Sequence, residues 1–303
     1  MEYRTFTLTC FDGHQMPVYE WEPAGEPKAV IHIIHGLWEH ALRYAPPAET
    51  LAQKGFAAYA HDNRGHGAAT KVLGDAGKNF FYNQVEDIRT LVHYYRERYP
   101  GKKIFLLGHS MGSLIAQRYF QLYGKEINGL ILSGTNGKPD PLLPIVMAIE
   151  WLQMKRYGGG YRSKIFYRLL NAKYNRPFKP LRTQFDWLSR DEQEVDKALS
   201  DPKMGFDCTA SFYYDLLSGT RDIFKKKNIL DIPSDIPVYA FSGDKDPAGL
   251  MGKGFMELIA NWKAAGIKDL EYKLYAGGRH EMMNEINRKE VLNDLSQWLE
   301  KHL

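Results

Sequence analysis

Strand-like runs alternate with helix-forming segments along most of the 303-residue chain, and few folds accommodate that alternation. The run at 29–34, AVIHII, is almost wholly apolar, as expected for a strand that helices cover on both faces. Further strands are predicted at 56–60, 103–107, 129–134, 237–243 and 270–275, with helical patterns between several of them, among them a helix at about 83–99. Repeated units of this kind predict a mostly parallel sheet with helices on both faces.

Two parts of the chain depart from this alternation. Residues 5–10 and 15–21 alternate in polarity around Asp12-Gly13 and predict an N-terminal hairpin, which brings the strand count to eight. From about 137 to 228 the sequence is helical and aromatic, without a clear buried strand. We therefore expect an α/β core formed by residues 1–136 and 229–303, with a helical cap, 137–228, inserted after the sixth strand.

The pattern Gly108-His109-Ser110-Met111-Gly112 has the G-x-S-x-G form of a nucleophile elbow. A predicted strand precedes it and a helix-forming run, 113–120, follows it. This context distinguishes a catalytic elbow from a chance match, because the serine must stand on a strained turn between strand and helix. Ser110 is the predicted nucleophile.

A serine hydroxyl group needs a histidine base, and the histidine needs a carboxylate to orient it. After such an elbow the acid and then the histidine follow at the ends of later strands. His280 follows the last predicted strand, and Asp246 follows the one before it. Spacing alone leaves Asp244 open as an alternative acid, since one of the two aspartates could instead stabilise a turn.

An oxyanion hole requires two backbone N–H donors, one of them on the residue after the nucleophile. That residue is Met111. The second donor is expected on the loop after an early strand, where His35-Gly36-Leu37 predicts the N–H group of Leu37.

Other polar loops are predicted to have structural roles. Asp62 and Arg64 lie in a glycine-rich loop and are expected to brace neighbouring loops rather than to react. His109 is not expected to act as a base, and His32 and His61 are assigned to strands. The sequence has no dinucleotide or phosphate-loop motif and no convincing metal-ligand spacing, so no cofactor and no metal are expected.

The composition is that of an ordinary globular protein, with 44% hydrophobic and 25% charged residues. A net charge of +4 does not indicate a nucleic-acid partner. The two distant cysteines, Cys10 and Cys208, indicate free thiols rather than a disulfide framework. The first residues lack the basic and apolar segments of a signal peptide, and a cytoplasmic location is expected.

Five motifs in this order resemble the monoacylglycerol lipase and lysophospholipase branch of the α/β-hydrolases, also classed under serine aminopeptidase S33. They are His35-Gly36-Leu37-Trp38-Glu39-His40 with Arg43-Tyr44, Asp62-x-Arg64-Gly65-His66-Gly67, Gly108 to Gly112, Gly243-Asp244-Lys245-Asp246, and His280-Glu281. The resemblance covers nearly the whole core and is weak across the cap. It implies the α/β-hydrolase fold, Asp246 as the acid, and Leu37 and Met111 as the oxyanion donors.

The resemblance also implies hydrolysis of a carboxylic ester through an acyl-enzyme. We expect a small acyl ester as substrate, of the monoacylglycerol or lysophospholipid type. Two alternatives stay open at this point. A serine aminopeptidase would need cap acids to hold an ammonium group, and Asp191, Glu192, Glu194 and Asp196 are available. A ligand-binding receptor with little turnover could share the fold.

The first half of the predicted cap is strongly basic. Residues 138–182 contain ten Lys or Arg against two acidic residues, and they also contain the apolar run 142–154. One interpretation is an amphipathic cap whose basic face is solvated. The other is peripheral contact with an anionic lipid surface or headgroup.

Overall fold

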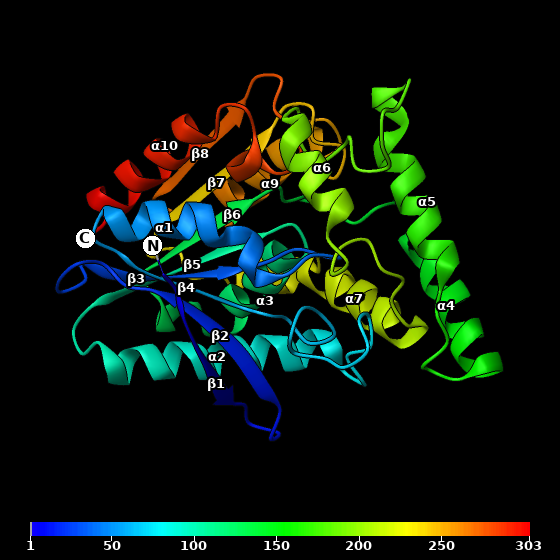
Figure 1. Ribbon diagram of the computed structural model, residues 1–303, viewed down its shortest axis with the longest axis horizontal. Helices are drawn as coiled ribbons and strands as arrows, with labels where there is room; N and C mark the ends of the chain where they lie inside the picture. Colours follow the sequence, from blue (N-terminus) through cyan, green and yellow to red (C-terminus); the bar gives the residue numbers. More distant parts are fainter. Residues whose placement is uncertain (1) are drawn as a thin grey trace.

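The structure, a computed structural model, describes residues 2–303 and centres on one β-sheet. Eight strands of these residues lie in the order β1-β2-β4-β3-β5-β6-β7-β8 (Figure 1). They are β1 (Arg4–Thr9), β2 (Gln15–Trp21), β3 (Ala29–Ile34), β4 (Ala57–His61), β5 (Lys103–His109), β6 (Gly129–Ser133), β7 (Val238–Gly243) and β8 (Leu270–Tyr275). β1 and β2 pair antiparallel with their neighbours, and β3 to β8 pair parallel, which confirms the predicted fold class.

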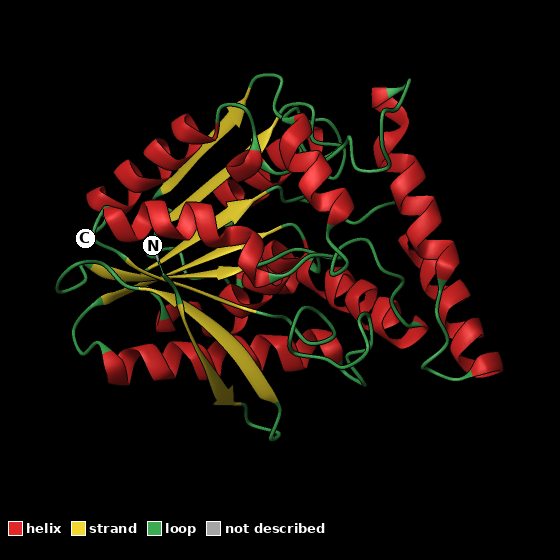
Figure 2. Cartoon of the chain, in the orientation of Figure 1, coloured by secondary structure: helices red, strands yellow, loops and turns green. Residues whose placement is uncertain are grey.

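Helices cover both faces of the sheet, as Figure 2 shows. They are α1 (Ala45–Gln53), α2 (Phe80–Arg98), α3 (Met111–Tyr123), α9 (Lys253–Ala264) and α10 (Arg288–Lys301). Buried side chains of α1 and α10 pack on one face of the sheet, and those of α2, α3 and α9 pack on the other. Every residue of β3 and β4 is buried, because side chains on both faces of these strands contact helices.

The chain between β6 and β7 forms a long helical insertion. Its helices are α4 (Leu143–Tyr157), α5 (Lys164–Asn175), α6 (Glu192–Ser200), α7 (Ala210–Ile223) and α8 (Lys226–Leu230). Figure 1 shows it beyond the carboxyl ends of the parallel strands, with α4 and α5 farthest from the sheet. Ligands bind at this edge in open α/β sheets, so the insertion lies over the expected site.

The start of α2 differs from the sequence prediction. The local pattern predicts a helix from residue 83, whereas α2 begins at Phe80. Asp215 of α7 accepts a hydrogen bond from the Phe80 N–H group at 3.0 Å, and the Phe80 ring stacks on Phe212 at 4.1 Å. The extra turn is stabilised by residues about 135 positions away, which a local pattern does not reveal.

No helix within residues 2–303 has the length and apolar character needed to cross a membrane.

Candidate active site

Ser110 stands alone between the last residue of β5 and the first residue of α3. Its backbone has φ 51° and ψ −119°, a strained conformation for a residue with a side chain. Gly112 lets α3 approach β3 closely, since a Cβ atom at this position would lie 2.1 Å from the Ile34 carbonyl oxygen. The predicted elbow geometry is present, and it presents the Ser110 side chain to a cavity.

Asp246 and His280 form a buried hydrogen-bonded pair. The His280 Nδ1 and Asp246 Oδ1 atoms are 2.9 Å apart, and Asp246 also accepts hydrogen bonds from Ala248 N–H and the Ser242 hydroxyl. Burial opposes the charged form of His280, but the Asp246 carboxylate outweighs burial and raises the pKa of His280 above its ordinary value. Because the Asp246 carboxylate is an acceptor, it favours a proton on His280 Nδ1. The other ring nitrogen, Nε2, is then free to accept a proton.

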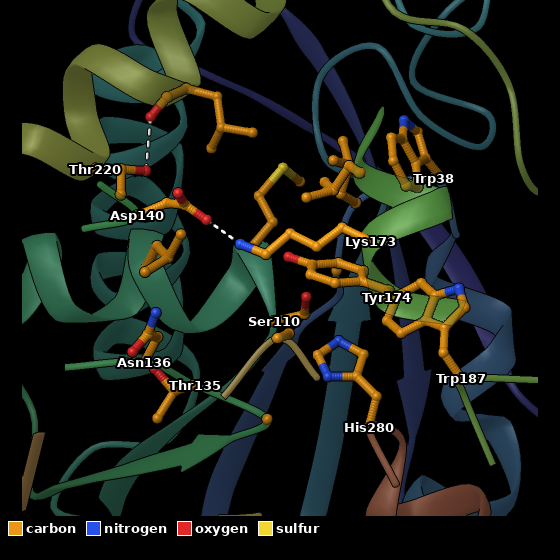
Figure 3. A pocket seen from close by; sticks show the side chains of 18 of the residues that line it. Trp38, Ser110, Thr135, Asn136, Asp140, Lys173, Tyr174, Trp187, Thr220 and His280 are labelled. Carbon is orange, nitrogen blue, oxygen red and sulfur yellow. Dashed lines mark hydrogen bonds and ion pairs between the residues drawn. The ribbon is translucent and has the colours of Figure 1, made fainter. Parts of the chain in front are cut away.

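The His280 ring is held between two other rings. The centroid of Trp187, from the insertion, lies 4.9 Å away, and the centroid of His109 lies 4.7 Å away. His280 and Ser110 line the same cavity, and Figure 3 shows both side chains directed into it. Within residues 2–303 the Ser110 hydroxyl group makes no hydrogen bond to His280. Such bonds commonly tighten when substrate binds.

The predicted oxyanion donors flank Ser110. Met111 is the first residue of α3, where a backbone N–H has no acceptor inside the helix. Leu37 lies in the loop after β3, and its N–H group has no acceptor in the described chain. A Cβ atom on the preceding Gly36 would lie 3.1 Å from Ser110 Cβ, so the loop passes close to the serine.

The other polar residues considered from the sequence lie elsewhere. Asp244 accepts a hydrogen bond from Gly277 N–H at 2.7 Å, so the structure brings Asp246 rather than Asp244 to His280. His109 is buried, and burial lowers its pKa to about 3. The Asp62 carboxylate accepts hydrogen bonds from the Ala41 and Ala68 N–H groups and from Tyr19, which confirms its bracing role.

A buried cluster of charged side chains lies beside the site, and it was not predicted from residue types or spacing. Arg43 contacts Glu39 at 2.9 Å and holds both oxygens of Glu281, at 2.5 and 2.7 Å. Burial would raise the pKa of Glu281, but the guanidinium group keeps it well below its usual range. Glu39 also accepts a hydrogen bond from Gly36 N–H. The cluster therefore ties the Leu37 loop to the His280 loop, and the only sequence signal for it was the family resemblance.

The cavity above Ser110 has a volume of about 710 Å³. Its upper wall is mostly apolar and comes from the insertion, through Leu142, Leu143, Val146, Phe166, Leu169, Leu170, Leu216 and Leu217. The acidic side chains lining it are Glu39, Asp140 and Glu281, and each pairs with a cation, Asp140 with Lys173 (Figure 3). A single apolar chain fits such a lining better than a charged group.

The cap acids considered for a peptidase do not line this cavity. Asp191 caps α6 and pairs with Arg288, Glu194 pairs with Lys197, and Asp196 pairs with Arg182.

One group of side chains in the described chain could hold a metal ion. Ligand atoms of Asp269, Glu271 and His302 lie within 4.8 Å of one another, away from the cavity. Lys301 already pairs with Glu271, and His302 contacts Asp269 at 3.0 Å. These contacts account for the charges there without an ion.

A protein-family model described as serine aminopeptidase, S33, matches residues 25–287, which include all the motifs above. The chain belongs to the serine aminopeptidase S33 family. The expected family resemblance is thereby confirmed.

Several proteins similar to this S33 family member are lipases or esterases. It is 29% identical to a monoacylglycerol lipase of Mycolicibacterium smegmatis, over 94% of this chain and 93% of that protein. It is 27% identical to the human monoglyceride lipase, over 96% and 89% of the two chains. The crystal structure of a thermostable carboxyl esterase from Bacillus coagulans in complex with glycerol matches it with a TM-score of 0.91, at 27% identity and 99% coverage of both chains.

The expected class, a carboxylic ester hydrolase, is confirmed by these relatives. Neither the peptidase nor the receptor alternative is favoured by them.

Proposed function

We propose that this S33 family member hydrolyses single-chain carboxylic esters of the monoacylglycerol type, with Ser110 as nucleophile, His280 as base and Asp246 as orienting acid. The observation that carries the proposal is that a strained serine and the histidine of a buried His–Asp pair line one mostly apolar cavity. Serine catalysis requires a nucleophile, a base and an acid that orients the base, and Ser110, His280 and Asp246 are of the residue types that supply them.

In the proposed mechanism, His280 Nε2 takes the Ser110 proton as the serine oxygen attacks the ester carbonyl. The N–H groups of Leu37 and Met111 stabilise the negative oxygen that develops. His280 then protonates the leaving alcohol, and an acyl-enzyme remains. Water, activated by His280, attacks the acyl-enzyme and releases the carboxylic acid and Ser110.

The cavity and the relatives both support this substrate class. Its apolar lining suits an acyl chain, and its volume suits one chain with a small headgroup. The relatives support a small alcohol such as glycerol as the headgroup. Two are named as monoacylglycerol or monoglyceride lipases, and the esterase was crystallised with glycerol.

Hydrolysis of p-nitrophenyl esters of graded chain length tests the proposal. We expect activity in the wild type and a loss of about 10³-fold or more in Ser110→Ala, because the nucleophile is removed. Ser200→Ala removes an exposed serine hydroxyl group of α6 that does not line the cavity, and it should retain most activity. Equal activity of Ser110→Ala and wild type would refute the assignment, and cleavage of aminoacyl amides alone would identify a peptidase.

We also propose that residues 137–228 form a cap and that this cap contacts a lipid surface. Eight apolar side chains of α4, α5 and their flanks are each at least 40% exposed, namely Leu142, Ile145, Trp151, Leu152, Tyr157, Tyr161, Ile165 and Leu169. Exposed basic side chains lie among them, Lys155, Arg156, Lys164 and Arg168. An apolar patch with basic residues suits an anionic membrane surface.

A cytoplasmic location is part of the proposal. Cys10 and Cys208 are both free and buried, which a reducing compartment accommodates. Fractionation of expressing cells tests the location.

A further inference from the structure

Trp38 has an unusual backbone conformation for its residue type. It follows Leu37 in the loop after β3 and has φ 63°, in the left-handed region that favours glycine. A bulky residue remains there only when its surroundings hold it in place. Trp38 is only 4% exposed, and its contacts show what holds it.

On the core side, Trp38 is bound to His66. The Trp38 N–H group donates to His66 Nε2 at 3.3 Å. His66 Nδ1 lies 3.1 Å from the Arg64 carbonyl oxygen and donates to it, so Nε2 is the acceptor nitrogen. Burial lowers the pKa of His66 to about 3 and keeps this ring neutral.

On the cap side, Trp38 contacts three separate segments. Its indole Nε1–H donates to the Tyr213 hydroxyl oxygen on α7 at 3.1 Å. Its ring packs edge-on against Tyr167 of α5, with centroids 4.7 Å apart. Its carbonyl oxygen accepts a hydrogen bond from the Gly205 N–H group at 3.1 Å.

The Tyr213 hydroxyl group is itself fixed in place. It accepts a second hydrogen bond, from Cys208 N–H at 3.2 Å, and the Tyr213 ring packs on Phe166 at 4.3 Å. The end of the Trp38 indole is therefore attached to a rigid part of the cap.

We propose that Trp38 is a positioning residue that couples the cap to the oxyanion hole. The Trp38–Tyr213 hydrogen bond holds the Leu37 N–H group in its position beside Ser110. The proposal rests on the proposed function, since it takes Leu37 as an oxyanion donor. Trp38 follows Leu37 directly, so a displacement of Trp38 pulls on the Leu37 Cα atom, to which the Leu37 N–H group is attached. When the cap shifts, the donor shifts with it.

A double-mutant cycle between Trp38→Phe and Tyr213→Phe tests the coupling, with p-nitrophenyl acetate as substrate. Its two-carbon acyl group makes little contact with the cap, so direct effects on substrate binding stay small. We expect each single variant to lower kcat by roughly tenfold with little change in KM, less than the 10² to 10³-fold loss on removing a donor outright. The double variant should be no slower than the slower single variant, because both lose the same hydrogen bond.

Trp21→Phe is the matched control. Trp21 is fully buried in β2, and its Nε1–H group has no hydrogen-bond partner among residues 2–303. This substitution should lower the urea midpoint about as much as Trp38→Phe does while leaving kcat unchanged. Unchanged kcat in both single variants, or losses that multiply in the double variant, would overturn the proposal. An active Ser110→Ala variant would instead overturn the proposed function.

Discussion

Asp246 and His280 form a buried pair in which each group controls the protonation of the other. The negative carboxylate raises the pKa of His280, and under the proposed mechanism His280 must be neutral to accept the Ser110 proton. We therefore expect kcat/KM to fall as the pH drops through this raised pKa. Asp246→Asn removes the charge, so the acid limb of the profile should move to lower pH and the maximal rate should fall by about 10³ to 10⁴-fold.

Asp244→Asn is the control for that measurement. Asp244 lies two residues away and accepts a hydrogen bond from Gly277 N–H, which an asparagine oxygen can also accept. Its pH profile should match that of the wild type. A larger rate loss in Asp244→Asn than in Asp246→Asn would mean that the acid has been assigned to the wrong residue.

Helix α3 and strand β3 meet at Gly112, where the elbow reaches the loop that carries Leu37. A methyl group there would lie 2.1 Å from the Ile34 carbonyl oxygen and 2.6 Å from that of His35, so helix and strand must move apart. We expect Gly112→Ala to destabilise the protein by about 1–3 kcal/mol. It should also lower kcat, since Ser110 and Leu37 lie on opposite sides of this contact. Urea denaturation and ester hydrolysis measure the two effects.

Gly25→Ala serves as the comparison, because a Cβ atom at Gly25 meets no atom within 4 Å. It should leave both measurements near the wild-type values. If Gly112→Ala were equally harmless, the close approach of α3 and β3 would not be what sets the elbow.

The strands of the core were predictable because continuous apolar runs report directly on burial. The start of α2 was not, because Asp215 and Phe212 stabilise it from another part of the chain. The residues of the site also divide into those that local sequence predicts and those that depend on distant contacts. Ser110 and His280 were predicted from motif and strand order, whereas the choice of Asp246 over Asp244 came from the family resemblance. The ion cluster of Glu39, Arg43 and Glu281 depends on pairs up to 238 positions apart.

The helical insertion between β6 and β7 was predictable only in outline. The apolar residues of α4 lie on both its buried and its exposed faces, so periodicity does not show which face is inside.

Across the whole molecule, charge is distributed unevenly, with a basic segment at residues 138–182 in a chain of net charge +4. We expect binding to vesicles of anionic phosphatidylglycerol and little binding to neutral phosphatidylcholine, with affinity falling as salt rises. Replacing Lys155 and Arg156 together by Gln should weaken binding by roughly tenfold or more, at about 1 kcal/mol per basic residue. Vesicle co-sedimentation measures it.

Replacing Lys125 and Lys289 by Gln makes the same charge change outside the cap, on exposed residues. This pair should bind vesicles like the wild type. Equal binding to neutral and anionic vesicles, or an equal loss in the control pair, would remove the assignment of the lipid contact to α4 and α5.

The ion cluster that joins Arg43 to Glu281 has a consequence for the newly made chain. During synthesis, Glu281 is added 238 residues later than Arg43, and His280 is added just before Glu281. A nascent chain that already carries Ser110 and the Leu37 loop still lacks its base and one of the two carboxylates that pair with Arg43. Under the proposed mechanism this nascent chain is inert toward lipids, and its chemistry begins only when His280 has been added and β8 and the following loop have joined the sheet.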